Sequence, residues 1–466
     1  MTLAAATRTT ATRAVRAVRA VPAMLRRPML REYWWLAAGS QGATVLSQIT
    51  TLLLVRTVTR VEVGQVVFAQ SVAVLAFLVL DPRFEDAVQR YVPLLRKESE
   101  ARSRALFWRL LRWDLGLGVA TTVAAALAWF TGVLPSTDLC RPGYLALAFS
   151  AIGVGSMIGT LHAGFAVSGG LPALGRRTIV ASVATATVTA VFVLNFGAGG
   201  YLAATVVAAA IQVALLLPYC LRHLSLRAVT TRPRLVDRTL PAGFVRFVVT
   251  SSLGTSLSVG SDSGMLAMVG LSGGPDLVAV IRVAGAPGRM LMSALSPIAT
   301  QVFPRLSRFA AEGDLAGIRR MTRKASLVVL VPVIPAILTS LVLMGPALEL
   351  LYGQRYRQAA PVAVLFVVAS CLRCLVLWAK VLPLAAGRPG LRVRVVAVES
   401  ALMLLLAFLV PKVLDGVPAV SAGIGAGVVV LTAGLASFWT WTSRREDLLQ
   451  PRRTRQPDMS RADVKS

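Results

Sequence analysis

Four cationic side chains fall inside apolar segments of this 466-residue chain. Arg282 and Arg289 share one apolar segment, Arg373 and Lys380 share another, and the members of each pair are seven residues apart. Seven residues are about two turns of an α-helix, so each pair is expected on one helix face. A charge at the centre of a bilayer costs about 2.5–3.5 kcal/mol. We therefore expect Arg289 and Arg373, which lie deep in their segments, to face a watery cavity.

Few acids are available to neutralise these cations. We expect Asp262 and Glu399 to be the deep carboxylates, which leaves two of the four cations unmatched. Lys380 and Arg282 lie nearer the ends of their segments, where a long side chain can reach the interface. The surplus favours a cavity for an anion. Residues 284–288 (Ala-Gly-Ala-Pro-Gly) predict a bend suited to a moving helix, with a purely structural kink as the alternative.

Hydroxyl side chains recur at helical spacing in two segments separated by an offset of 211 residues. The first set is Ser40, Thr44, Ser47 and Thr51, and the second is Ser251, Thr255, Ser258 and Asp262. The +4, +3, +4 spacing places each set on one helix face. Such hydroxyls line a polar cavity, or only bond their own backbone or a neighbouring helix.

The composition identifies the elements that must hold these side chains. Charged residues make up 15% of the chain and hydrophobic residues 56%, with 49 Lys plus Arg, 21 Asp plus Glu and a net charge of +28. Mean hydropathy is +0.69. Soluble domains carry about 25% charged residues, and disordered chains have low hydrophobicity. These values exclude an ordinary cytosolic enzyme, a nucleic-acid-binding protein and a disordered chain, and they predict an all-α polytopic membrane protein.

No enzyme, metal or cofactor motif is present in the sequence. Cys371-x-x-Cys374 lies in an apolar run with no second pair and no nearby histidine, so a zinc site is not expected. No phosphate-binding loop, dinucleotide fingerprint or Ser/His/Asp grouping occurs. We expect a protein that is not an enzyme and that needs no cofactor or metal.

Twelve segments are long and apolar enough to cross a bilayer, which takes about 20 residues. They are 35–55, 64–80, 113–131, 143–162, 178–196, 200–221, 244–268, 277–302, 326–344, 359–385, 393–410 and 417–441. Lys and Arg concentrate on the cytoplasmic side of a membrane. With the N-terminus inside, few of them fall in outer loops, namely Arg56, Arg60, Arg141, Arg355, Arg357 and Lys412. This asymmetry predicts that both termini are cytoplasmic.

The same offset of 211 residues indicates an internal duplication. Pro93 corresponds to Pro304, and Arg112 to Arg323. Six crossings in each half leave both halves in the same orientation, which predicts two parallel six-helix bundles with a substrate path between them. We expect a basic cytoplasmic tail at 1–33, bundles at 34–222 and 244–441, a basic cytoplasmic linker at 223–243, and a disordered cytoplasmic tail at 442–466.

The N-terminal tail is basic and contains no acids before residue 32. We interpret it as a cytoplasmic segment that lies on anionic membrane lipid. An organelle transit peptide, which would be removed, is the alternative.

Four short runs match, in order, runs of a known family. Leu53–Gly64 looks like its Arg-x-Leu…Glu-x-x-Gly segment, and Val280–Ala284 looks like the start of its eighth span. Phe303–Asp314 is similar to its next linker, and Leu350–Pro361 to its loop between spans nine and ten. On these runs the chain resembles the polysaccharide-biosynthesis (Wzx-type) flippases, relatives of the multidrug and toxin extruders (MATE) in the MOP superfamily, over residues 33–441.

The resemblance implies a MATE-like fold and the flipping of an undecaprenyl-pyrophosphate-linked oligosaccharide from the inner to the outer leaflet. This would occur by alternating access in the bacterial cytoplasmic membrane, for cell-surface polysaccharide synthesis. Expected partners are the lipid-linked anionic oligosaccharide and a polysaccharide polymerase or another glycan-assembly protein, without nucleic acid. The charge argument assigns the headgroup to Arg56, Arg282, Arg289 and Arg373, and ion coupling or charge pairing to Asp262 and Glu399. Sugar hydroxyls would contact Ser40, Thr44, Ser47, Ser251, Thr255 and Ser258.

Three alternatives remain. A MATE-type drug or metabolite antiporter would use acids in its cavity, where Asp262 and Glu399 are the expected deep candidates. A lipid II flippase usually has extra C-terminal spans. A transport-inactive scaffold for glycan assembly would need no polar cavity, which the two hydroxyl sets argue against.

Overall fold

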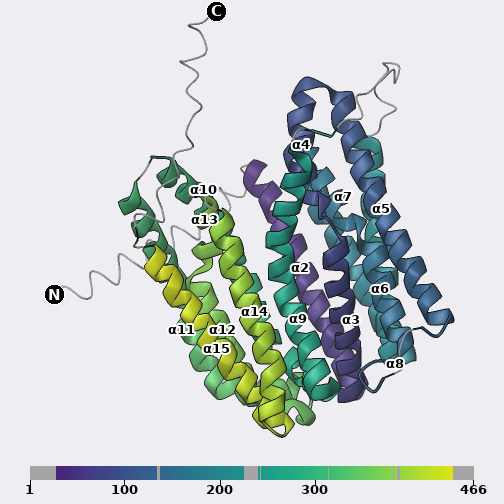
Figure 1. The fold of residues 1–466 in the computed structure, drawn as a ribbon, viewed down its shortest axis with the longest axis vertical. Coiled ribbons are helices and arrows are strands. Elements are labelled where there is room, and N and C mark those ends of the chain that lie inside the picture. The colour runs from purple at the N-terminus through teal and green to yellow at the C-terminus, as the bar shows by residue number, and fades with distance from the viewer. Residues whose placement is uncertain are drawn as a thin grey trace, which may run out of the picture. The chain divides into compact units, whose positions relative to one another are not determined.

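The chain is helical throughout the part that the structure, a computed structural model, describes: residues 28–133, 137–224, 240–241, 243–312, 314–380, 382–385, 389–443 and 445. The N-terminal tail to residue 27, most of the 223–243 linker and the C-terminal tail from residue 446 lie outside the described residues. The helices, shown in Figure 1, are α2 (Pro28–Thr57), α3 (Arg60–Leu80), α4 (Phe84–Glu98), α5 (Glu100–Phe130), α6 (Pro142–Gly155), α7 (Met157–Val167), α8 (Leu171–His223), α9 (Phe244–Ala284), α10 (Ala286–Glu312), α11 (Leu315–Tyr352), η2 (Gln354–Ala359), α12 (Ala360–Leu375), η3 (Leu377–Lys380), α13 (Leu382–Ala385), α14 (Pro389–Val413) and α15 (Val417–Thr442). The predicted all-α polytopic membrane fold is confirmed.

Nine helical segments of the described chain are long and apolar enough to cross a membrane. One of them, α8, has 53 residues, or about 80 Å of straight helix for a hydrocarbon layer of about 30 Å. It is a hairpin, because Gly197 has φ 58° and ψ −136° and Arg177 donates to the carbonyl of Leu215 on the returning arm. Its arms match the predicted spans 178–196 and 200–221.

The helix α9 is also interrupted. Gly274 has φ 80° and ψ 173°, values outside the helical region, and separates two arms. The first arm of α9 and the 30-residue α2 are each long enough for a crossing. Together with the second crossing of α8, they bring the nine candidate segments to the twelve that the sequence predicts.

The chain divides into two compact units. The first contains the described residues of Met1–Leu54, Leu80–Leu134 and Ala146–Val249, and the second those of Val55–Val79, Pro135–Leu145 and Thr250–Ser466. The predicted halves at 34–222 and 244–441 follow chain order, whereas in this division the end of α2 and most of α3 belong with the second unit.

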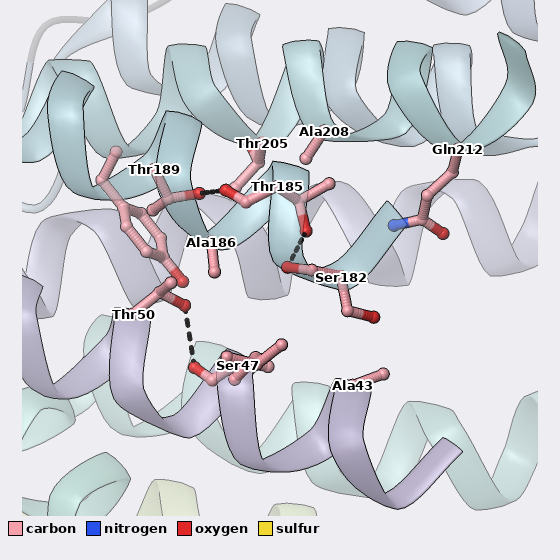
Figure 2. A pocket seen from close by; sticks show the side chains of 12 residues that line it. Ala43, Ser47, Thr50, Ser182, Thr185, Ala186, Thr189, Thr205, Ala208 and Gln212 are labelled. Carbon is pink, nitrogen blue, oxygen red and sulfur yellow. Dashed lines mark hydrogen bonds between the residues drawn. The ribbon is translucent and has the colours of Figure 1, made fainter. Parts of the chain in front are cut away.

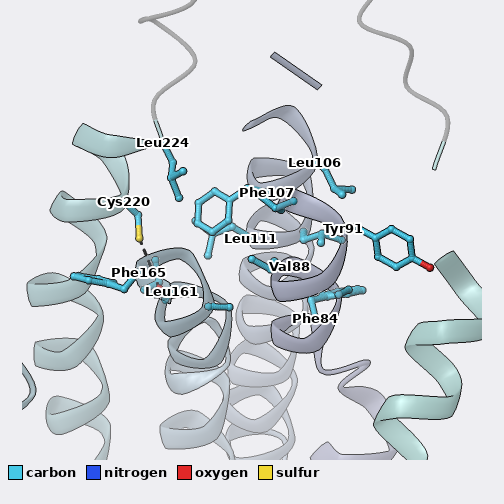
Figure 3. Close-up of a cluster of buried hydrophobic side chains, with 14 of the residues drawn as sticks. Phe84, Val88, Tyr91, Leu106, Phe107, Leu111, Leu161, Phe165, Cys220 and Leu224 are labelled. Carbon is cyan, nitrogen blue, oxygen red and sulfur yellow. Dashed lines mark hydrogen bonds between the residues drawn. The ribbon is translucent and has the colours of Figure 1, made fainter. Parts of the chain in front are cut away.

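A buried aromatic and aliphatic cluster holds one end of the first unit together (Figure 3). Phe84 and Val88 of the amphipathic α4 belong to this cluster together with Phe107 of α5 and Leu161 of α7, and the Tyr91 ring points away from Phe107 and Leu161. Tyr91 also packs edge-on against Phe247 at the start of α9, with ring centroids 5.6 Å apart. The cluster therefore fixes α4, which carries charged side chains on its other face, against three membrane-crossing helices.

In the second unit, α12 packs against α10, α11 and α15 (Figure 1). The predicted span 359–385 is present as a candidate membrane span over Gln354–Leu375, but its predicted end is wrong, because α12 ends at Leu375 and is followed by η3 and α13. Ser326 donates to the carbonyl of Leu375 at 2.6 Å, and the Trp378 indole donates to Ser326 at 3.0 Å. These bonds satisfy the helix end. The break also means that Arg373 and Lys380 do not share one helix face.

Candidate functional site

A cavity of about 280 Å³ lies in the first unit between α2 and the two arms of α8 (Figure 2). The helices approach closely at Gly39 and Gly175, where a Cβ on Gly39 would lie 2.8 Å from the carbonyl oxygen of Gly175. The lining residues are Ala43, Leu46, Ser47, Thr50, Ser182, Thr185, Ala186, Thr189, Tyr201, Thr205, Ala208 and Gln212.

The lining of this cavity is partly polar but contains no Asp, Glu, His, Lys or Arg side chain. Its threonines donate their protons to their own helices: Thr50 to Ser47 at 2.9 Å, Thr185 to Ser182 at 3.0 Å, and Thr189 to Thr185 at 2.7 Å. Each hydroxyl oxygen then keeps its lone pairs, so the wall accepts more hydrogen bonds than it donates. Such a wall suits a neutral group rich in hydroxyl donors and disfavours an anion.

The cavity contains part of the first predicted hydroxyl set. Ser47 lines it, whereas Ser40 and Thr44 do not, and the Thr44 hydroxyl donates to the Ser40 carbonyl at 2.9 Å. The α8 residues of the lining were not predicted, although Ser182, Thr185 and Thr189 follow +3, +4 spacing, which was the available signal.

The second predicted hydroxyl set lies on the first arm of α9. Ser251 is half-buried and Asp262 is exposed, while the side chains of Thr255 and Ser258 lie outside the described residues. Nearby, Ser261 and Ser400 hydrogen-bond to each other and so connect α9 to α14. Ser261 is not a member of the second set, so this contact between α9 and α14 gives the set itself no role.

Arg282 and Arg289 flank the break between α9 and α10. At the predicted bend α9 ends at Ala284 and α10 begins at Ala286, so a one-residue break separates them. Helical hydrogen bonds continue through it, from the Gly285 N–H to the Ile281 carbonyl at 2.9 Å and from the Arg289 N–H to the Gly285 carbonyl at 3.1 Å. The Arg289 guanidinium folds back and donates to the Arg282 carbonyl at 2.7 Å. A Cβ on Gly285 would lie 2.7 Å from Arg289 Nη1, so the glycine leaves room for this guanidinium.

Neither arginine of this pair forms an ion pair with an acid among the described residues. The Nε of Arg282 is buried without a hydrogen-bond partner in that part of the chain. Asp262 and Tyr352 are close enough to Arg289 to interact electrostatically without bonding to it. The structure therefore places two cations, with donors uncommitted to any acid, at the break.

Arg373 and Arg56, two of the remaining predicted cations, already have partners. Arg373 donates to Glu399 at 2.9 Å, joining α12 to α14, and the two side chains are 29% and 21% exposed. Arg56 donates to the carbonyls of Leu350 and Leu351 at the end of α11. The side chain of Lys380 lies outside the described residues.

One buried acid was not among the predicted site residues. Asp114 of α5 is 3% exposed, and its carboxylate accepts a hydrogen bond from the Thr160 hydroxyl of α7. Ser156 donates to the Asp114 main-chain carbonyl at 3.0 Å. The predicted span 113–131 already contained this residue, so its position was the available signal.

Metal-binding groups were not predicted. Among the described residues, no group of three or more His, Cys, Asp and Glu side chains is placed to hold a metal ion.

Solved structures with a similar fold are transporters. A multidrug resistance MATE family transporter of the MOP superfamily in an inward-facing conformation aligns with a TM-score of 0.59 and 14% identity over 86% of this chain and 95% of its own. An outward-facing conformation of a multidrug resistance MATE family transporter aligns with a TM-score of 0.56 and 14% identity over 91% of this chain and 98% of its own. A MOP superfamily transporter from Pyrococcus furiosus aligns with a TM-score of 0.57 and 15% identity over 90% of this chain and 96% of its own. That transporter is described as having a binding pocket of reverse polarity. No protein-family model and no curated protein sequence matches the chain. The chain is thus a multi-pass membrane protein with the fold of the MATE transporters.

Proposed function

We propose that this chain moves an anionic, hydroxyl-rich amphiphile of the lipid-linked oligosaccharide kind between membrane leaflets by alternating access. The observation that carries the proposal is the Arg282–Arg289 pair, two cations in apolar helices that no described acid neutralises by an ion pair. Each such cation costs about 2.5–3.5 kcal/mol of insertion free energy. A phosphate or pyrophosphate group repays that cost, because guanidinium groups bind its oxygens through two parallel hydrogen bonds.

The cavity in the first unit supports the saccharide part of the proposal. Its hydroxyl oxygens accept hydrogen bonds and it is lined by no charged side chain, which suits sugar hydroxyls better than phosphate. Ser47, Thr50 and Gln212 supply polar atoms at different levels of its wall (Figure 2). The two chemistries of a glycolipid headgroup are thus present in separate units of the chain.

Arg56 and Arg373 are weaker members of the predicted headgroup set. The Arg56 guanidinium already donates to two main-chain carbonyls, and Arg373 already faces Glu399. We therefore assign the headgroup primarily to Arg282 and Arg289. In this proposal the protein lies in the bacterial cytoplasmic membrane with both termini cytoplasmic, its tail at 1–33 contacts anionic lipid, and a polysaccharide polymerase is a candidate partner.

The test is glycolipid flipping by the purified chain in proteoliposomes. The probe is a fluorescent polyprenyl-pyrophosphate-linked oligosaccharide. A membrane-impermeant quencher measures the fraction of this probe that lies in the outer leaflet of the proteoliposomes. We expect Arg282→Gln and Arg289→Gln each to lower the flipping rate at least tenfold. The matched control is Arg394→Gln, an exposed arginine of α14. Equal rates for wild type and both variants would remove the basis of the proposal.

A MATE-type cation-coupled antiporter is the second candidate, favoured by the buried Asp114. A carboxyl in an apolar membrane helix is expensive to keep and is typical of proton or cation pathways. In this case Asp114→Asn, which still accepts from Thr160, would abolish proton-driven export of a cationic dye while the protein still accumulates. Under the glycolipid proposal, Asp114→Asn flips glycolipid normally and no dye is exported.

A transport-inactive scaffold makes a different prediction. Variants at Arg282 and Arg289 would then leave surface polysaccharide unchanged in cells while deletion of the whole protein abolishes it.

A further inference from the structure

Two arginines of the second unit each bind the end of a helix from the other half of the sequence. Arg56 donates from Nε to the Leu351 carbonyl at 2.6 Å and from Nη2 to the Leu350 carbonyl, both at the end of α11. Arg355 of η2 donates from Nη2 to the Val55 carbonyl at 2.5 Å and to the Arg56 carbonyl at 3.3 Å, both at the end of α2. We call these reciprocal contacts the arginine clamp.

The acceptors of the clamp are groups that need donors. The last four carbonyls of an α-helix have no partner within the helix, and the helix dipole makes that end negative. A guanidinium there forms charge-assisted hydrogen bonds, which are stronger than neutral ones. Both helices end within two residues of the bound carbonyls, at Thr57 and Tyr352, so each arginine satisfies an end that would otherwise depend on water.

A second link lies beside the clamp and joins α3 to α9. Arg60, at the start of α3, forms an ion pair of 2.8 Å with Asp276 of α9, with side chains 18% and 35% exposed. The Tyr356 ring is fully buried, and the guanidinium carbons of Arg60 and Arg355 each lie 5.8 Å from its centre. The clamp and this ion pair are therefore parts of one continuous contact.

The contact connects the two halves of the sequence at the ends of their helices. Arg56 and Arg60 flank the turn between the first two predicted spans, whereas Asp276 and Arg355 belong to the second half. In the predicted topology all of them lie on the outer side. We propose that the arginine clamp is the outer gate of the transporter: it holds this side closed, and it must open for release to the outside. This inference rests on the proposed function only in treating the chain as an alternating-access transporter.

The polar nature of the clamp suits a contact that opens repeatedly. Water can replace each guanidinium at a carbonyl as the ends separate, so opening leaves no carbonyl of the clamp without a donor. A hydrogen bond to a charged group changes an equilibrium by on the order of tenfold, and partial exposure reduces this effect. Removing either arginine should therefore raise the ratio of open to closed outer ends by about three- to tenfold.

Distances between spin labels measure this ratio directly. We would label Val61→Cys of α3 and Gln354→Cys of η2, both exposed positions on opposite sides of the contact, after replacing the four buried native cysteines with alanine. The protein is the full chain in lipid nanodiscs without substrate. We expect Arg56→Ala and Arg355→Ala each to shift the distribution toward the longer distance.

The matched control is Arg357→Ala. Arg357 is two residues from Arg355, but its ion pair is with Glu349 of the same half, at 3.2 Å, so we expect no shift. Distributions for both clamp variants that coincide with the Arg357→Ala distribution would overturn the gate. If Arg355→Ala does not fold, Arg355→Lys keeps the charge but loses the forked donor, and its distribution decides in the same way. A chain that opens on clamp removal but flips no glycolipid would refute the proposed substrate and leave the gate intact.

Discussion

Removing the charge of Arg373 tests whether this residue forms a structural ion pair or contacts the substrate. Arg373 and Glu399 lie 2.9 Å apart and are 29% and 21% exposed. At an effective dielectric constant of about 20, two unit charges about 4 Å apart attract by about 4 kcal/mol. Desolvation offsets much of that attraction. Truncating one partner of a fully buried pair costs about 3–5 kcal/mol, and partial exposure reduces the cost here to about 1–2 kcal/mol.

The assay is a double-mutant cycle on unfolding in mixed detergent micelles. A loss of about 1–2 kcal/mol lowers the ratio of folded to unfolded protein by about 5–30-fold, so Arg373→Gln should be clearly less stable than wild type. In Arg373→Gln with Glu399→Gln, no unpaired charge remains between α12 and α14. We expect this double variant to recover most of the stability, and glycolipid flipping with it.

Additive effects would refute the reasoning, because residues that form a coupled pair give non-additive free energies. A double variant that is stable but does not flip glycolipid would instead assign Arg373 to the headgroup, as the sequence predicted.

Three further predictions address packing, reactivity and the cavity. Gly64→Ala should destabilise the chain by about 1–3 kcal/mol, because a Cβ there would lie 1.7 Å from the Pro275 carbonyl oxygen. Gly116→Ala is the control, since a Cβ at Gly116 would have no neighbouring atom within 4 Å. Equal melting temperatures for the two variants would contradict this prediction. Burial raises the pKa of the Cys140 thiol to about 12, so the thiol stays protonated at pH 8. It should therefore react with a maleimide only after the protein is unfolded, and rapid labelling of the native chain would contradict this prediction. Thr189→Val removes one acceptor from the cavity wall and should slow glycolipid flipping while leaving the melting temperature within a few degrees; an unchanged rate would exclude this wall from the path.

The sequence predicted features that depend on local chemistry. The all-helical membrane fold followed from composition, and the break at 284–288 followed from its glycines and proline. The hairpin of α8 turns at Gly197, between two spans that the sequence separated correctly. The end of α12 at Leu375 could not be predicted in the same way, because no glycine or proline marks it. That end depends on Ser326, which is 49 residues from Leu375 in the sequence, and on Trp378, which follows the last turn of the helix.

The partners of charged groups were harder to predict, because most of the contacts are distant in sequence. Asp114 was overlooked within a predicted span, and its hydroxyl partner Thr160 is 46 residues away. The acceptors of Arg56 are main-chain carbonyls 294 and 295 residues away. A carbonyl has no identity in a sequence, so no pattern of residue types distinguishes an arginine that binds a helix end from one that binds a ligand.

The structure therefore changes what the surplus of cations means. Counting charges in apolar segments predicted an anion-binding cavity from Arg56, Arg282, Arg289 and Arg373 together. Arg56 instead binds a helix end, and Arg373 faces an acid. Among the four, Arg282 and Arg289 pair with no described acid and bind no carbonyl of a distant helix end, although Arg373 Nε, like Arg282 Nε, is buried without a partner among the described residues. Because the pair lies where the helix is interrupted, movement of that break would change the spacing of the two guanidinium groups. The affinity for an anion would then depend on the conformation, which a transporter requires if it is to release what it binds.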